Sequence, residues 1–184
     1  MPVQTPICDF GQKALPFELK STDNKIISLN DIKGENGTLI MFICNHCPYV
    51  KAITKEIIED CNELKKIGIS SVAICSNDFV NHPEDSFENM IKFSNENHFN
   101  FPYLHDDTQE IAKSYDAVCT PDFFGYNKNL ELQYRGRLRE LKNFIPVKDG
   151  ESDLLKAMRQ VAETGSGPKD QTPSAGCGIK WKYD

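Results

Sequence analysis

The pattern of apolar and polar residues predicts a strand followed by a helix in the first third of the chain. Residues 38–43 (Thr-Leu-Ile-Met-Phe-Ile) form an apolar run of strand length. After Pro48, apolar residues recur at spacings of three and four, which is typical of a helix with one buried face. These residues are Val50, Ile53, Ile57, Cys61 and Leu64. Gly68 is a suitable end, so we expect one helix between Pro48 and Gly68.

The same pattern predicts a second strand at residues 69–75, which are rich in β-branched side chains. A strand, a helix and a further strand imply a parallel pair. Turn residues between apolar runs predict hairpins at 17–29 and 122–135. Further predicted elements are a helix from Pro83 to near Asn97, a strand at 101–104, a helix capped by Asp106 or Asp107, and a helix at about 152–164.

The final segment of the chain has a different composition. From Gly165 it has no periodicity and many glycines and prolines. We therefore expect a domain at residues 1–164 and a C-terminal arm at 165–184. Ile179 and Trp181 are suited to anchor this arm to the domain, since disordered segments contain few aromatic residues.

Composition and charge exclude several classes of function. The chain of 184 residues carries 21 Lys and Arg against 27 Asp and Glu, interspersed, for a net charge of −6. This balance argues against a nucleic-acid surface. No secretory signal and no run of membrane-spanning length is visible, so no membrane association is expected. Seven cysteines, mostly isolated, favour a reducing compartment, and we expect a cytoplasmic protein.

Two cysteines, Cys44 and Cys47, lie between the predicted strand and the predicted helix. Thiols at a helix start face free N–H groups and the positive end of the helix dipole, which favours the thiolate. Pro48 fits the first turn of such a helix. His46 adds a cation or a donor, and cationic neighbours lower the pKa of cysteines in this motif. We interpret the motif as a redox site, with Cys44 as the more acidic and more exposed attacking thiol and Cys47 as its resolving partner.

A structural zinc site is the simplest alternative for two cysteines at this spacing. Such a site needs a second pair, whereas the remaining cysteines are isolated. These are Cys8, Cys61, Cys75, Cys119 and Cys177. No resident metal and no cofactor is therefore expected. An alternative of another class is a non-enzymatic metal-binding or redox-sensing module, in which the pair binds a soft ion with Cys119 or Cys177.

The order of these elements and motifs resembles the thioredoxin superfamily, an α/β fold with a central mixed β-sheet flanked by helices, an N-terminal β-hairpin and, here, a C-terminal extension. Residues 17–34, 101–106 and 118–124 are similar to the hairpin, helix lead-in and cis-proline loop of its redoxin branch, the alkyl hydroperoxide reductase and thiol-specific antioxidant family. The likeness covers roughly residues 10–165. The ending at 176–182 resembles the tail of a bacterial subgroup that carries Cys-Asn-His-Cys-Pro.

The resemblance implies a thiol–disulfide oxidoreductase in cell redox homeostasis, acting on protein or small-molecule disulfides. An external thiol reductant such as thioredoxin would restore the dithiol. Thr120-Pro121 would be a cis peptide facing the cysteines and would help to bind substrate. A homodimer is compatible with this resemblance.

A peroxiredoxin-like hydroperoxide reductase is the enzymatic alternative, in which a sulfenic acid on one thiol condenses with the other. Peroxiredoxins carry P-x-x-x-T-x-x-C before their reactive thiol. Aligned on Cys47, this chain has Ile40 in place of the proline and Cys44 in place of the threonine. The missing threonine hydroxyl argues against efficient peroxide turnover. Arg135 or Arg137 could bind substrate through a guanidinium group, although a solvated strand edge is the more ordinary interpretation.

Two further cysteines have open roles. Cys119 precedes Thr120 and fits a small buried strand residue. Cys177 lies between Gly176 and Gly178, which would permit the rearrangement that a second resolving cysteine requires. A spectator role for Cys177 is the favoured interpretation, because Cys47 offers the nearer partner.

Overall fold

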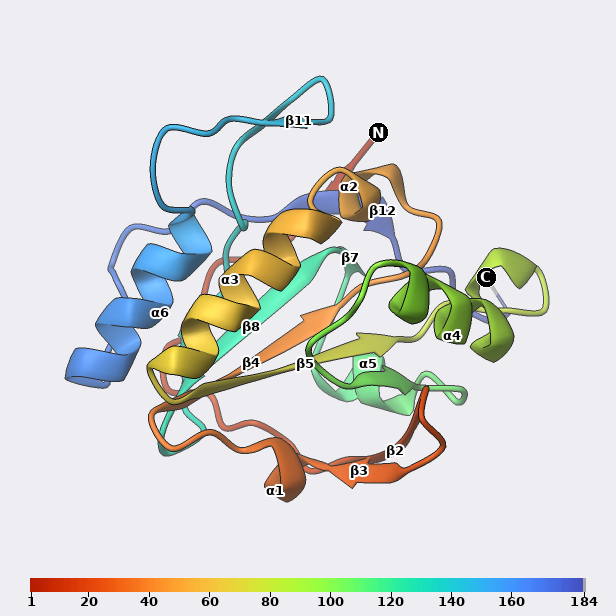
Figure 1. The fold of residues 1–184 in the computed structure, drawn as a ribbon, viewed down its shortest axis with the longest axis horizontal. Coiled ribbons are helices and arrows are strands. Elements are labelled where there is room, and N and C mark those ends of the chain that lie inside the picture. Colours follow the sequence, from red (N-terminus) through yellow and green to blue (C-terminus); the bar gives the residue numbers. More distant parts are fainter. Residues whose placement is uncertain (184) are drawn as a thin grey trace.

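The computed structural model describes residues 1–183, which form a central mixed sheet of seven strands with helices on both faces (Figure 1). In spatial order the strands are β3 (Ile26–Ser28), β2 (Glu18–Ser21), β6 (Tyr103–His105), β5 (Ile69–Cys75), β4 (Gly37–Phe42), β8 (Asp122–Asn127) and β9 (Leu132–Tyr134). Strand β5 pairs in parallel with β4 and β6, and the other pairs are antiparallel. The predicted mixed sheet, both hairpins and the parallel strand–helix–strand unit are confirmed.

The two faces of the sheet bury separate cores, because successive side chains of a strand point to opposite faces. Leu39 and Met41 of β4 pack in one cluster with helices α3 (Thr54–Lys66), α4 (Phe87–Glu96) and α6 (Asp153–Thr164). Ile40 and Phe42 pack in the other cluster with α1 (Leu29–Ile32) and α5 (Glu110–Ser114). All six residues of β4 are buried. The cysteines therefore follow a strand that is fixed on both faces.

The helix after the cysteines is divided in two, which corrects the prediction of one continuous helix. Helix α2 covers Pro48–Lys51, and α3 begins at Thr54 after Ile53, whose φ of −119° and ψ of 5° are not helical. The Thr54 hydroxyl donates to the Val50 carbonyl at 2.8 Å, and such bonds compete with the backbone ladder. The predicted buried stripe is nevertheless correct, because all five of its residues lie in the core.

Two other helices begin differently from the prediction. Pro83 opens a short 3-10 turn, η1 (Pro83–Asp85), and α4 begins after Ser86, whose hydroxyl accepts the Asn89 N–H at 3.2 Å. Helix α5 begins after Gln109 rather than directly after Asp106. The Asp106 carboxylate still accepts the Ala112 N–H at 2.9 Å. Asp106 therefore pairs with a free N–H group in the first turn of α5, although it lies several residues before the helix. The last helix, α6, agrees with its prediction.

The C-terminal arm forms a strand on the body of the protein. Strand β12 (Ala175–Gly178) lies between β1 (Val3–Gln4) and β7 (Cys119–Thr120) in a small antiparallel sheet. In Figure 1, β12 lies close to α2 and β7. Ile179 is buried in the second core cluster and Trp181 packs against it, so the predicted anchoring is confirmed. The division at residues 164 and 165 stays a prediction.

The remaining elements are peripheral. Strands β10 (Leu141–Lys142) and β11 (Ile145–Pro146) form a separate two-stranded hairpin. Among residues 1–183, the helices are all too short or too polar to cross a lipid bilayer.

Candidate active site

The end of β4 and the start of α2 position the two thiols of the C-x-x-C motif. Cys47 is the residue before α2, and Pro48 occupies the first helical position, as expected. Cys44 follows Ile43, whose N–H still pairs with the Ile74 carbonyl at 3.0 Å. Cys44 is 1% exposed and Cys47 is 0% exposed. The expectation that Cys44 is the more exposed thiol therefore has no support, because both sulfur atoms are covered.

The loop before Pro121 brings one residue against both thiols. The Thr120–Pro121 peptide is cis, as the resemblance implied. The Thr120 hydroxyl oxygen lies 3.4 Å from Cys44 Sγ, and the Cys47 thiol donates to the Thr120 carbonyl at 3.3 Å. The structure thus joins Cys44, Cys47 and Thr120 in one hydrogen-bonded group.

The two thiols of the pair titrate together, because each contacts the other. The hydrogen bond from the Cys44 thiol lowers the pKa of Cys47 to about 4 against the opposing effect of burial, with help from the thiol and N–H of Cys177 and the N–H of Val50. The hydrogen bond to Cys47, then burial, then the Asp85 charge raise the pKa of Cys44 well above its ordinary value.

The contacts of the pair favour Cys47 as the thiolate, whereas the sequence predicts Cys44. Cys47 has the thiols of Cys44 and Cys177 beside it, whereas Cys44 faces a buried carboxylate.

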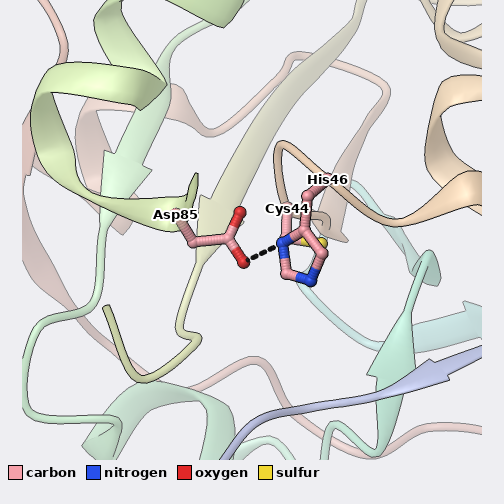
Figure 2. A group of neighbouring side chains, drawn as sticks. All are labelled: Cys44, His46 and Asp85. Atoms are coloured by element: carbon pink, nitrogen blue, oxygen red, sulfur yellow. Dashed lines mark ion pairs between the residues drawn. The ribbon is translucent and has the colours of Figure 1, made fainter. Parts of the chain in front are cut away.

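His46 directs its Nδ1 toward Asp85, and a ring nitrogen of His46 also lies within 4.8 Å of Cys44 Sγ (Figure 2). Its Nδ1 lies 2.6 Å from the Asp85 carboxylate, which also accepts the Asn45 N–H and the Asn77 side-chain amide, each at 2.8 Å. The side chain of Asp85 is fully buried. The role of His46 as a cation or donor beside the thiols stays a prediction, and its ion-pair partner is Asp85. The His46 ring stacks on His82, with centroids 6.1 Å apart.

Asp85 is a site residue that the sequence did not reveal. Cys44 Sγ, a His46 ring nitrogen and an Asp85 oxygen lie within 4.8 Å of one another (Figure 2). Thiolate, imidazole and carboxylate are the donors that zinc uses, so this group could hold a divalent ion. It differs from the predicted soft-ion set, which combined the two thiols with Cys119 or Cys177. In the sequence, the only feature of Asp85 is its position two residues after Pro83. That position predicts the start of a helix and gives no indication of a site residue.

A cavity of about 550 Å³ opens beside His46. Its lining is polar and of mixed charge, with Asn45, Lys51, Glu84 and Lys92 among its residues. Cys119 is not among the residues that line this cavity. It is buried, as predicted for a small strand residue, and burial raises the pKa of its thiol.

The two candidate arginines are held in ion pairs. Arg135 is buried, and its guanidinium donates to Asp122 at 2.9 and 3.3 Å and to the Asp116 carbonyl at 2.8 Å. Arg137 donates to Asp153 at 2.7 Å. Within residues 1–183 neither arginine bonds a thiol. The interpretation of Arg135 as an exposed residue at a strand edge is therefore wrong. These contacts do not support a role for either guanidinium in substrate binding.

A family model for the AhpC/TSA family matches residues 10–141, which is most of the chain. The chain belongs to the AhpC/TSA family. This assignment confirms the redoxin resemblance and supports an oxidoreductase function of the thioredoxin-like type. No curated protein sequence matches the chain.

Solved structures confirm the thioredoxin-like fold of this AhpC/TSA chain. An uncharacterised conserved protein from Geobacillus kaustophilus is 41% identical, with a TM-score of 0.88, over 100% of this chain and 98% of that one. A hypothetical protein from Sinorhizobium meliloti 1021 is 31% identical, with a TM-score of 0.90, over 100% of both chains. A putative thiol:disulfide interchange protein from Chlorobium tepidum shares the fold at 16% identity and a TM-score of 0.62, over 84% and 97% of the two chains.

Proposed function

We propose that this AhpC/TSA chain is a thiol–disulfide oxidoreductase in which Cys44 and Cys47 cycle between dithiol and disulfide. The observation that carries the proposal is the contact of both sulfur atoms with Thr120, at 3.4 and 3.3 Å, together with the hydrogen bond between the two thiols. Two thiols held this closely can form a disulfide without a large backbone movement.

The hydrogen bonds of the pair assign an order to the chemistry. The Cys47 thiolate attacks one sulfur of a disulfide, forms a mixed disulfide and releases one thiolate. Cys44 then loses its proton and attacks Cys47 Sγ, which releases the second thiolate and leaves the Cys44–Cys47 disulfide. The Asp85 carboxylate, which His46 Nδ1 contacts at 2.6 Å, lies within 4.8 Å of Cys44 Sγ, and we assign it as the acceptor of that proton through one intervening water. An external thiol reductant such as thioredoxin restores the dithiol.

Peroxide reduction is the second candidate, and one observation favours it: the acidic thiol is Cys47, the position on which the peroxiredoxin pattern aligns. Two observations weigh against it. Cys44 replaces the threonine, and the Arg135 guanidinium is bound to Asp122. We therefore rank disulfide exchange first. The cytoplasmic location and a homodimer stay predictions from the sequence.

The test is turnover of a small aromatic disulfide that releases a coloured thiolate, with an excess of dithiol reductant. Wild type is expected to turn over, whereas the double variant Cys44→Ser/Cys47→Ser is expected to lose turnover. Cys8→Ser is the matched control, because Cys8 is a partly exposed cysteine of the other core cluster. Turnover of the double variant at the wild-type rate would overturn the proposal. Stoichiometric metal in reduced, purified protein would instead favour the metal-binding alternative.

Replacing Asp85 with Asn should lower the pKa of Cys44, because a nearby negative charge disfavours the thiolate. The second ionisation of the reduced pair, followed by thiolate absorbance in the ultraviolet, should move to lower pH. Asp107→Asn, a change at an exposed carboxylate, serves as the control. An unchanged second ionisation in Asp85→Asn would show that Asp85 does not act on Cys44.

A further inference from the structure

The arm places a third thiol beside the active-site pair. In the antiparallel pairing of β12 with β7, Cys177 lies directly opposite Thr120. Directly opposed residues project their side chains from the same face of a sheet. The Thr120 hydroxyl contacts Cys44 from that face, and the Cys177 thiol is within hydrogen-bonding reach of Cys47. Three thiols therefore surround Thr120.

The arm is fixed on both sides of Cys177. Ser174 donates through its hydroxyl to the Pro121 carbonyl at 2.8 Å, and the Ile179 N–H donates to the Val118 carbonyl at 3.2 Å. A Cβ atom on Gly176 would lie 1.9 Å from the Thr120 carbonyl oxygen, so this close approach requires glycine. Cys177 is thus held in register with Thr120 by the contacts of its neighbours.

The three thiols differ in their access to solvent. Cys44 and Cys47 are buried, whereas Cys177 is partly exposed. In addition, β12 occupies the edge of β7, so an extended peptide cannot add to that edge by backbone pairing. Cys177 is therefore the most accessible of these three residues to a disulfide in solution.

We propose that Cys177 is a third redox thiol that carries electrons from the buried Cys44–Cys47 pair to a disulfide in solution. The proposal rests on the Cys44–Cys47 dithiol cycle proposed above but gives the first attack on the substrate to Cys177 instead of Cys47. It identifies the substrates as small-molecule disulfides or disulfides exposed on a folded surface, since these need no strand pairing. It assigns to the arm a chemical role in addition to its structural one.

The relay balances as three exchanges. Cys177 releases its proton to solvent and attacks the outer disulfide, forming a mixed disulfide. The released substrate thiolate takes up a proton from solvent. The Cys47 thiolate next attacks Cys177 Sγ, which forms the Cys47–Cys177 disulfide and expels the second substrate thiolate into solution. Cys44 passes its proton to Asp85, as in the reaction proposed above. Cys44 finally attacks Cys47 Sγ and releases the Cys177 thiolate, so two electrons reach the substrate.

The first test traps the intermediate. In Cys44→Ser the relay lacks its last step, so one equivalent of a small disulfide should yield a Cys47–Cys177 disulfide within one chain, identified by mass spectrometry of peptides. The same experiment with Cys44→Ser/Cys8→Ser should give the same product. Recovery of Cys177 as a free thiol beside a Cys47 mixed disulfide would overturn the relay.

The second test measures the rate. Cys177→Ser should slow oxidation of the Cys44–Cys47 pair by the small disulfide by about tenfold or more, because direct attack must wait for the arm to open. Cys177→Ala should behave alike, and Cys8→Ser should match wild type. Equal rates in wild type and both Cys177 variants would show that the substrate reaches the Cys44–Cys47 pair without reacting with Cys177. That result would overturn the relay and leave the proposed function intact. Failure of wild type to form the Cys44–Cys47 disulfide would instead overturn the proposed function.

Discussion

Replacing Cys47 with Ser is expected to remove the acidic thiolate and to stop disulfide exchange. The hydrogen bond from Cys44 and the donors of α2 and β12 hold the pKa of Cys47 at about 4, whereas an isolated cysteine titrates near 8.5. Wild type should therefore keep its thiolate absorbance as the pH falls from neutral and lose it only near pH 4. The variant should show no thiolate in that range.

Cys44→Ser provides the matched comparison. A serine hydroxyl can still donate to Cys47, so the low-pH thiolate should remain, whereas Cys44→Ala removes the largest cause of the shift and should move the midpoint upward. A wild-type midpoint near the ordinary cysteine value would contradict the assignment of the acidic thiol. If the thiolate of Cys47→Ser still titrates near pH 4, the acidic thiol is Cys44.

Replacing Arg135 with Met should lower the free energy of unfolding by about 3–5 kcal/mol, since breaking a buried ion pair leaves one charge without its partner. Asp122 is fully buried, and burial raises its pKa against the opposing effect of Arg135. Arg135 also lies 4.3 Å from the centroid of the Phe124 ring, a contact that Met keeps only in part. Urea unfolding at neutral pH measures the loss.

The pH dependence of this variant has a defined sign. Without Arg135 the folded-state pKa of Asp122 rises further above its unfolded value, so the charged form is disfavoured and stability falls as the pH rises. The loss should therefore be smaller in acid than at neutral pH. The double variant Arg135→Met/Asp122→Asn should recover part of the loss at neutral pH. A change below about 1 kcal/mol, the range of an exposed pair, would show that the ion pair is not buried in solution.

The strand, the thiols and the start of the helix could be predicted because each depends on neighbouring residues. The apolar run before Cys44 predicts a buried strand, and Pro48 indicates a helix start. The break at Ile53 could not be predicted from the periodicity, because the Thr54 hydroxyl takes the Val50 carbonyl without disturbing the buried stripe.

The rest of the site depends on contacts between residues distant in the sequence. Asp85 reaches the Asn45 N–H and His46 from η1, and no local pattern of the sequence records that contact. The pairing of β12 with β7 joins Cys177 to Thr120 across a segment without periodicity. These same contacts favour Cys47 as the thiolate, whereas the residues next to the motif in the sequence favour Cys44.

The most direct test of the central claim is the disulfide map of oxidised wild-type protein. After equilibration in a mildly oxidising thiol–disulfide buffer, free thiols are alkylated and the peptides are identified by mass spectrometry. The account predicts one disulfide, Cys44–Cys47, within a single chain, with Cys8, Cys61, Cys75, Cys119 and Cys177 alkylated after unfolding. Recovery of both Cys44 and Cys47 as alkylated thiols under conditions that oxidise an ordinary dithiol would contradict it.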